Sequence, residues 1–293
     1  MSHDDELPAL LLARLSSLVA AVHRADDLVR TGDPEGIHDL RVALRRTRSL
    51  VSGFGAELAL DPADSTALHA ELRRAGQELS ELRDVEVVEE RLFRALGAET
   101  EHPSAAARAL VDDYVHDARQ EATMRAEAMR RSPAWSELLA ALDRLGQAGC
   151  EAAPDTARRR LRQDWRRLCK RARAADPAAG EDHEGATVLH DVRKAAKKAR
   201  YTAETLAPLL GDKAVRMQRA AEQVQETLGD HRDTLLTRRV LRLLGDQPRI
   251  GGDVGFLLGR LHAEEEQAGV DALRRAADAL EQVREKRLRR WLG

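Results

Sequence analysis

The sequence predicts an all-α protein. Apolar residues recur at helical spacing along the whole chain, and no segment alternates apolar and polar residues as a half-buried strand does. Leu, Ala, Arg and Glu are abundant, which favours helices, whereas aromatic residues make up only 3% of the chain. A length of 293 residues is enough for one large core or for two linked ones.

Four helical regions are predicted in the first half of the chain. They run roughly over 5–30, 35–54, 62–97 and 103–147, the last interrupted near Pro133. Turn-forming sequences separate them, because glycine and proline end helices: Thr31-Gly32-Asp33-Pro34, Asp61-Pro62 and His102-Pro103.

Four more helical regions follow a break between Gly146 and Pro154. They run roughly over 155–175, 186–210, 212–245 and 252–291. The breaks between them lie at Asp176-Pro177, Gly211-Asp212 and Gly251-Gly252. The segment 174–187, rich in Ala, Gly and acidic residues, is predicted to be a mobile loop.

One short motif occurs twice, at an offset of 152 residues. The first copy is His38-Asp39-Leu40-Arg41, followed by Arg45, Arg46 and Arg48. The second is His190-Asp191-Val192-Arg193, followed by Lys197, Lys198 and Arg200. Each pair of equivalent positions matches in charge type. A duplicated pattern of histidine and cations predicts an anion site built from two related halves.

The duplication extends beyond this motif. Leu79-Ser80-Glu81-Leu82-Arg83-Asp84 matches Leu228-Gly229-Asp230-His231-Arg232-Asp233 at an offset of 149, so a small insertion or deletion separates the motifs. Each half then contains four helical regions, with a boundary near 147–154. We therefore expect two four-helix bundles related by pseudo-twofold symmetry, formed by 1–150 and 151–293.

Each copy of the motif forms a cationic stripe on its helix. Positions i, i+3, i+7 and i+10 lie on one helix face, and the histidine and three of the cations occupy them in both copies. The opposite faces are apolar: Leu40, Ala43, Leu44, Thr47 and Val51 in the first copy, and Val192, Ala195, Ala196, Ala199 and Ala203 in the second. A charged helix face that merely contacts solvent normally contains acids between its cations, which form i,i+4 ion pairs. Each stripe holds only one carboxylate, Asp39 or Asp191, so a solvated face is a less favoured interpretation.

Charge is segregated along a chain whose net charge is only −2. The segment 157–173 carries nine cations against the single acid Asp164, so it can focus a strong local field. Only six of the 48 cations are lysines. A guanidinium suits phosphate oxygens, although an arginine-favouring base composition of the genome would give the same bias.

The remaining composition indicates a cytoplasmic protein. Cys150 and Cys169 form no metal-binding spacing, and so few cysteines favour a reducing compartment. The acidic first residues differ from a signal peptide, Arg14 interrupts the first apolar run, and no 18 consecutive residues are apolar. We expect no contact with a membrane.

These segments resemble the CHAD domain family, whose name stands for conserved histidine, alpha-helical. The resemblance rests on the two stripes at 37–48 and 189–201, supported by Leu82-Arg83-Asp84-Val85 and 228–233, and it extends over nearly the whole chain. It implies two four-helix bundles with a basic central groove, binding of inorganic polyphosphate and association with polyphosphate granules. Some relatives carry a fused triphosphate-tunnel domain, for which this chain has no room.

Three other chemistries compete with anion binding. The sequence contains no His-Glu-x-x-His motif for metal binding. Asp112-Asp113-x-x-His116 could place two ligands on one helix, but no second helix carries the matching motif that a metal site in a helix bundle needs, so we expect no metal site and no cofactor. His38 and His190 could accept a phosphoryl group, although no nucleotide-binding glycine loop is present. Hydrolysis of polyphosphate would need carboxylates that hold a metal ion. The repeated aspartates fit better as ion-pair partners that orient the arginines. Adjacent Arg and Asp residues do not face each other on a helix, so the partners of the Arg-Asp segments are expected to come from other helices.

Nucleic acid is the fourth rival, because arginine stripes bind any polyanion. Single-strand binders add aromatic side chains on which bases stack, and this chain has few. Trp135, Trp165, Phe54 and Phe93 have the spacing of packing residues, and only Tyr201 lies on a cationic stripe. Nucleic acid is therefore a less favoured ligand than one without bases.

The sequence thus predicts a non-catalytic protein that binds inorganic polyphosphate, with a general polyanion binder or a histidine phosphoacceptor as the alternatives. Arg41, Arg45, Arg48, Arg193, Lys197 and Arg200 are expected to contact phosphate oxygens, and His38 and His190 to donate hydrogen bonds. Arg46, Lys194 and Lys198 are expected to flank the stripes, and Arg166, Lys170, Arg171 and Arg173 to extend them. A polyphosphate-metabolising enzyme is a possible partner.

Overall fold

A computed structural model describes residues 3–33, 35–98, 103–147, 149–153, 155–180, 183–248 and 250–293. Within them the chain is helical and contains no strand, which confirms the all-α prediction. The helices of the first half are α1 (His3–Arg30), α2 (Gly36–Phe54), α3 (Pro62–Ala98), α4 (Pro103–Arg130) and α5 (Pro133–Gly146). Those of the second half are α6 (Thr156–Ala174), η1 (Pro177–Ala179), α7 (His183–Leu210), α8 (Asp212–Gly245), α9 (Gly252–Arg284), α10 (Lys286–Arg289) and η2 (Arg290–Leu292).

The structure differs from the predicted elements at three places. Ser132 caps α5 by accepting a hydrogen bond from the amide of Trp135, so the interruption near Pro133 separates two helices. Extended backbone at Glu285 ends α9 before residue 291. The predicted mobile loop at 174–187 is short and packed: η1 and the start of α7 occupy most of it, and Gly180 is buried against Leu189 and Leu273.

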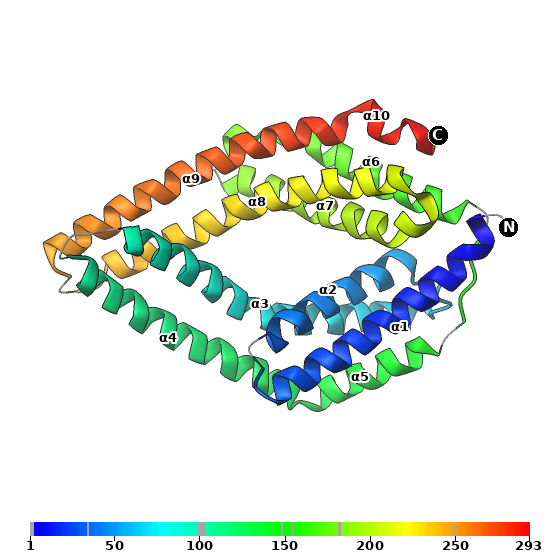
Figure 1. The fold of residues 1–293 in the computed structure, drawn as a ribbon, viewed down its shortest axis with the longest axis horizontal. Coiled ribbons are helices and arrows are strands. Elements are labelled where there is room, and N and C mark those ends of the chain that lie inside the picture. Colours follow the sequence, from blue (N-terminus) through cyan, green and yellow to red (C-terminus); the bar gives the residue numbers. More distant parts are fainter. Residues whose placement is uncertain are drawn as a thin grey trace.

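The helices form an elongated molecule with one half of the chain along each side (Figure 1). Consecutive long helices pack together within each half. Between the halves, α2 contacts α7, α3 contacts α8 and α4 contacts α9. These pairs join helices that the internal repeat makes equivalent, which agrees with a pseudo-twofold relation between the halves.

The buried core does not follow the boundary between the halves. One apolar cluster contains Leu40, Leu79, Val192 and Leu228, and the other joins the end of α3 and the start of α4 to the end of α8 and the start of α9. Both clusters therefore draw on both halves, and the repeats share their cores. The division into two separate four-helix bundles at residue 150 stays a prediction.

Helix α1 is long and apolar enough, by length and composition, to cross a membrane. Its apolar face is occupied in this fold, since Leu7, Leu11, Leu15 and Val22 are buried in the first cluster. The helix of a packed core meets the same compositional criterion as a membrane span.

Candidate functional site

Helix α2 presents the first cationic stripe. All five residues predicted for its apolar face, from Leu40 to Val51, are buried. Arg41, Arg45 and Arg48 lie on the other side of the helix and are only partly exposed. This burial pattern fixes the rotation of α2, and with it the direction of the stripe.

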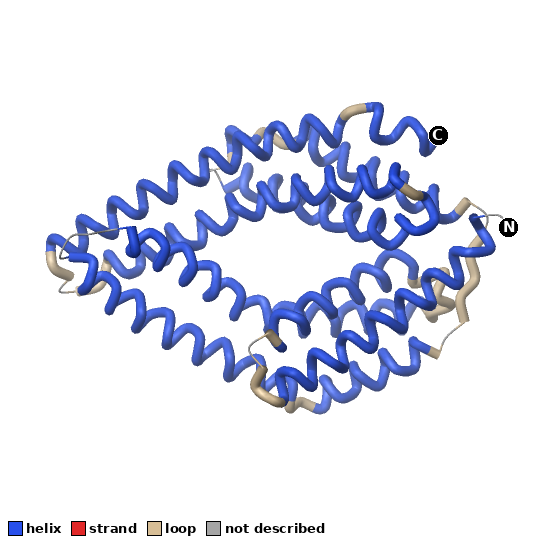
Figure 2. Tube along the Cα trace, in the orientation of Figure 1, coloured by secondary structure: helices blue, strands red, loops and turns tan. Residues whose placement is uncertain are grey.

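Helix α7 presents the second stripe in the same way. Its predicted back, from Val192 to Ala203, is fully buried, and Arg193 and Lys197 are partly exposed. Four alanines in that back allow neighbouring helices to approach closely. The contact between α2 and α7 then brings the two stripes together across the middle of the molecule, where α3 and α8 also face each other (Figure 2).

Eight cations form one electrostatic cluster there, which we call the central cation cluster. Lys197 is repelled by Arg45 and Arg48 of the other half as well as by Arg193 and Arg232, and Arg41 and Arg48 are repelled by cations of α3. The members are Arg41, Arg45 and Arg48 of α2, Arg73 and Arg83 of α3, Arg193 and Lys197 of α7, and Arg232 of α8.

Most of these cations are not in an ion pair within the part of the chain that the structure describes. Among the residues that the structure describes, Arg41, Arg48, Arg73, Arg193 and Lys197 have no carboxylate within ion-pair distance. Burial, followed by repulsion from Arg45, lowers the pKa of Arg41 to about 10. Burial, followed by repulsion from Arg193, lowers the pKa of Lys197 to about 7. The site therefore holds partly buried cations in an environment that disfavours their charge.

Internal contacts position two of these arginines. The Nε of Arg45 donates a hydrogen bond to the hydroxyl of Tyr201, at 2.7 Å, which links α2 to α7. The guanidinium of Arg193 lies against Gly229, where a Cβ atom would come within 3.1 Å of Nη2. The glycine in the second repeat thus makes room for an arginine of the stripe.

An ion pair between the halves closes one side of the cluster. Arg232 of α8 donates two hydrogen bonds to Asp84 of α3, at 3.0 Å and 2.8 Å. Arg232 and Asp84 thus have a partner on another helix, as expected from the sequence, although Arg232 also lies 3.8 Å from the neighbouring Asp233. Arg83 instead pairs with Glu86 of its own helix.

The two motif histidines lie at exposed positions at the start of the stripes. Partial desolvation, followed by repulsion from Lys194 and Arg193, lowers the pKa of His190. We therefore expect His190 to be largely neutral at pH 7 in the free protein. No hydrogen bond of either imidazole is found among the described residues, so both ring edges are free to meet a ligand.

Four cations predicted to bind phosphate or to flank the stripes instead pair with acidic residues. Most of these acids lie on a neighbouring helix and one lies on the same helix. Arg46 and Arg14 share Glu204, and Lys198 lies 3.9 Å from the buried Asp164. Arg200, which we expected to contact phosphate, lies 2.9 Å from Glu222 and above the ring of Tyr201. Lys194 pairs with Asp191.

The cations of α6 divide between two faces. Arg171 pairs with Asp191 at 3.0 Å and so lies beside the second stripe. Arg166 lines a cavity together with Lys286 and Arg289, and the charge of Arg173 acts on the thiol of Cys169 together with the charge of Arg289. Lys170 is exposed. Among the described residues, an ion pair with a motif residue is found for Arg171 alone in this group.

The sequence prediction omitted three cations of the central cation cluster. Arg83 and Arg232 belong to the repeated Arg-Asp segment, so the repeat itself carried a signal for them. Arg73 carried none, because its equivalent position in the second half is Glu222. His69 also lies next to the cluster, beside Arg73. Its pKa is lowered by burial and, to a smaller extent, by repulsion from Arg48. In the described residues no three His, Cys, Asp or Glu side chains lie together in a way that could hold a metal ion.

The CHAD domain family model matches residues 13–242, a range that includes both stripes and both Arg-Asp segments. This chain belongs to the CHAD domain family. The family is associated with polyphosphate binding, and the helical fold of the chain agrees with that of the family's solved structures.

Two uncharacterized proteins from two strains of Mycobacterium tuberculosis are each 31% identical to the chain over 250 residues, which is 82% of this chain. The chain spans only 46% of the length of these relatives. The CHAD domain of the plant Ricinus communis has a TM-score of 0.68 and 27% identity, covering 96% of this chain and 93% of that one. PptA from Streptomyces chartreusis shares the fold, with a TM-score of 0.77, 24% identity, and coverage of 94% and 99%.

Proposed function

We propose that the chain binds inorganic polyphosphate, without catalysis of its own, in a basic groove between its two halves. One observation carries this proposal. Eight cations from both halves form a single cluster, and five of them have no ion-pair partner among the described residues. A polyanion would supply the missing negative charge at these five cations.

The physical chemistry of the cluster favours a phosphate chain. Partly buried cations without partners destabilise the protein that holds them, and an anion bound between them removes that cost. Guanidinium groups bind phosphate oxygens through two parallel hydrogen bonds, and charge-assisted bonds of this kind are strong. A chain with one charge or more on each phosphate can contact several arginines at once.

The aromatic residues support a ligand without bases. Tyr201 is buried, accepts the hydrogen bond of Arg45 and lies under Arg200. Trp135, Trp165 and Phe54 are buried in the core, and Phe93 packs in the second apolar cluster. None of these aromatic side chains therefore offers a free ring at the central cation cluster on which a base could stack.

We further propose that the protein acts in the cytoplasm, on polyphosphate granules, beside an enzyme that makes or degrades the polymer. The composition and the family support this setting. Because the chain spans about half of the matched relatives, such an enzyme could also be a neighbouring part of a longer protein.

A calorimetric titration with long-chain polyphosphate at several salt concentrations tests the function directly. Binding releases counterions, and the logarithm of the affinity should fall with the logarithm of salt concentration with a slope of about −0.7 per contacted phosphate. If about six cations make contact, affinity drops by roughly 300-fold between 50 and 200 mM salt. An affinity independent of salt would contradict the charge-dominated mechanism.

Proton uptake should accompany binding because of Lys197. Its pKa of about 7 in the free protein leaves this side chain partly neutral at pH 7 and mostly neutral at pH 8. A bound polyanion favours the charged form and raises the pKa, so the contribution of Lys197 to affinity should be fully present below pH 7 and fall as pH rises above it. Titrations at pH 8 in two buffers of different ionisation enthalpy measure the uptake, which we expect to approach one proton.

The Lys197→Met variant is the control for this proton. It should bind more weakly and take up little or no proton at pH 8. If the variant took up as many protons as the natural chain, the titrating group would be another residue, with His190 as the first candidate because its lowered pKa also rises beside phosphate.

A further inference from the structure

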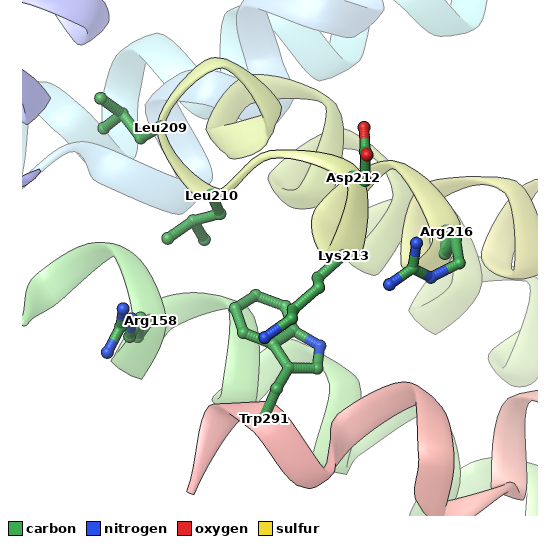
Figure 3. A pocket seen from close by; sticks show the side chains of 7 residues that line it. All are labelled: Arg158, Leu209, Leu210, Asp212, Lys213, Arg216 and Trp291. Atoms are coloured by element: carbon green, nitrogen blue, oxygen red, sulfur yellow. The ribbon is translucent and has the colours of Figure 1, made fainter.

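One cationic cavity of the molecule shares no residue with the central cation cluster. It has a volume of about 350 Å³ and lies where α6, α8, the end of α7 and η2 meet (Figure 3). Its lining consists of Arg158, Leu209, Leu210, Asp212, Lys213, Arg216 and Trp291. Cavities of about 300 Å³ or more are large enough for a small organic ligand.

Positive charge predominates in this cavity. Arg158, Lys213 and Arg216 are exposed, and in the part of the chain that the structure describes none of them has an ion-pair partner. Asp212 is the single acid of the lining and occupies the first turn of α8, where helix amides favour a carboxylate. Figure 3 shows its carboxylate pointing away from Trp291. The cavity therefore has the charge to hold an anionic group.

An indole ring forms the floor of the same cavity. Trp291 is half-buried, and its Nε1 donates a hydrogen bond to the carbonyl of Leu288 at 2.8 Å, which fixes the orientation of the ring. The ammonium of Lys213 lies 5.7 Å from the ring centroid (Figure 3). Leu209 and Leu210 add apolar surface beside it. One wall of the cavity thus suits a flat apolar group.

We propose that this cavity binds a nucleoside phosphate, with the base stacked on Trp291 and the phosphates held by Arg158, Lys213 and Arg216. Stacking of a base on the indole contributes more free energy than the cation–π contact of a single exposed ammonium does. The base therefore displaces Lys213, whose flexible side chain turns to the phosphates. This combination of a ring and three cations distinguishes the cavity from the central cation cluster, which offers cations without a free aromatic face.

Trp291 supplies its own spectroscopic probe. The chain has three tryptophans, and the other two, Trp135 and Trp165, are 3% and 0% exposed. Titration of the full chain with ATP should therefore quench the fluorescence of Trp291 in a saturable way, and calorimetry should give the same affinity. Trp291→Phe, which keeps the apolar packing, should abolish the quenching and weaken binding several-fold.

Charge variants locate the site. Arg158→Ala combined with Arg216→Ala should weaken ATP binding at least tenfold. Arg219→Ala, an exposed cation one turn further along α8 and outside the lining, should leave it unchanged. The variant Arg45→Ala with Lys197→Ala should also bind ATP like the natural chain, because the two sites are separate.

Four outcomes would overturn the proposal. The first is no saturable binding of ATP at millimolar concentration. The second is tripolyphosphate binding as tightly as ATP with no effect of Trp291→Phe, which would indicate a simple polyanion surface. The third is equal losses in the Arg216 and Arg219 variants. The fourth is loss of ATP binding in the Arg45 and Lys197 variant, which would place the nucleotide in the central cation cluster.

Discussion

Replacing Arg45 and Lys197 together by alanine should weaken the binding of long-chain polyphosphate by about 100-fold or more. The two residues come from different halves and belong to the same cluster. A hydrogen bond to a charged group contributes about 1.5–3 kcal/mol, so two lost contacts correspond to roughly two to four orders of magnitude in affinity. Calorimetric titration measures the loss directly.

The same double variant should keep its helix content and melt at nearly the same temperature. Both side chains point away from the apolar backs of α2 and α7, so truncation leaves no cavity in the core. Burial, followed by repulsion from Arg193, lowers the pKa of Lys197 to about 7, so removal of this disfavoured charge offsets the lost hydrogen bond from Arg45 to Tyr201. Circular dichroism and thermal melts check both expectations.

A matched control is the pair Arg74→Ala and Arg219→Ala. Arg74 pairs with Glu71 within one turn of α3, and Arg219 is exposed on α8. The control removes two cationic side chains outside the central cation cluster, and we expect a loss of less than about threefold. If both pairs lost affinity equally, net charge rather than the cluster would govern binding. If the alanine variant failed to fold, Arg45→Gln with Lys197→Met would keep the side-chain volume and serve the same comparison.

The sequence was sufficient to predict the stripes because each one lies on a single helix. Helical periodicity alone separates Leu40 and Leu44 from Arg41 and Arg45, and the burial of every predicted apolar position confirms the assigned faces. The repeat also predicted which helices are equivalent. The contacts of α2 with α7 and of α3 with α8 agree with the pseudo-twofold relation that the repeat predicts.

Partners that come from distant helices could not be predicted in this way. Nothing local indicates that Glu204 neutralises Arg46, that Asp164 approaches Lys198 or that Glu222 pairs with Arg200. These acids reduce the charge that the stripes seem to carry in the sequence. For the same reason the sequence did not predict that Arg73 belongs to the cluster. It also did not predict that the two halves share both apolar clusters.

Affinity for the central cation cluster should rise steeply with the length of the polyphosphate chain. One orthophosphate can contact only two or three of the eight cations, whereas a longer chain adds contacts without a new association step. We expect orthophosphate to bind at least about a thousandfold more weakly than a long chain, with intermediate lengths in order until the cluster is filled. Displacement of labelled long-chain polyphosphate by chains of defined length measures the series. Orthophosphate that competed as well as a long chain would point instead to a small-ligand or phosphoacceptor site at His38 or His190.

The same displacement assay should rank long polyphosphate above both single-stranded and duplex nucleic acid at equal phosphate concentration and physiological salt. A duplex presents its charges on a wide rod, whereas the two stripes lie on adjacent helices and suit a thin chain. Single strands fit better, but each base left unstacked forgoes about 1–3 kcal/mol, because Tyr201 is buried and already bound to Arg45. Introducing an exposed aromatic residue, as in His38→Trp, should therefore improve RNA affinity more than polyphosphate affinity. If RNA or DNA displaced the label as efficiently as unlabelled polyphosphate, the natural site would be that of a general polyanion binder.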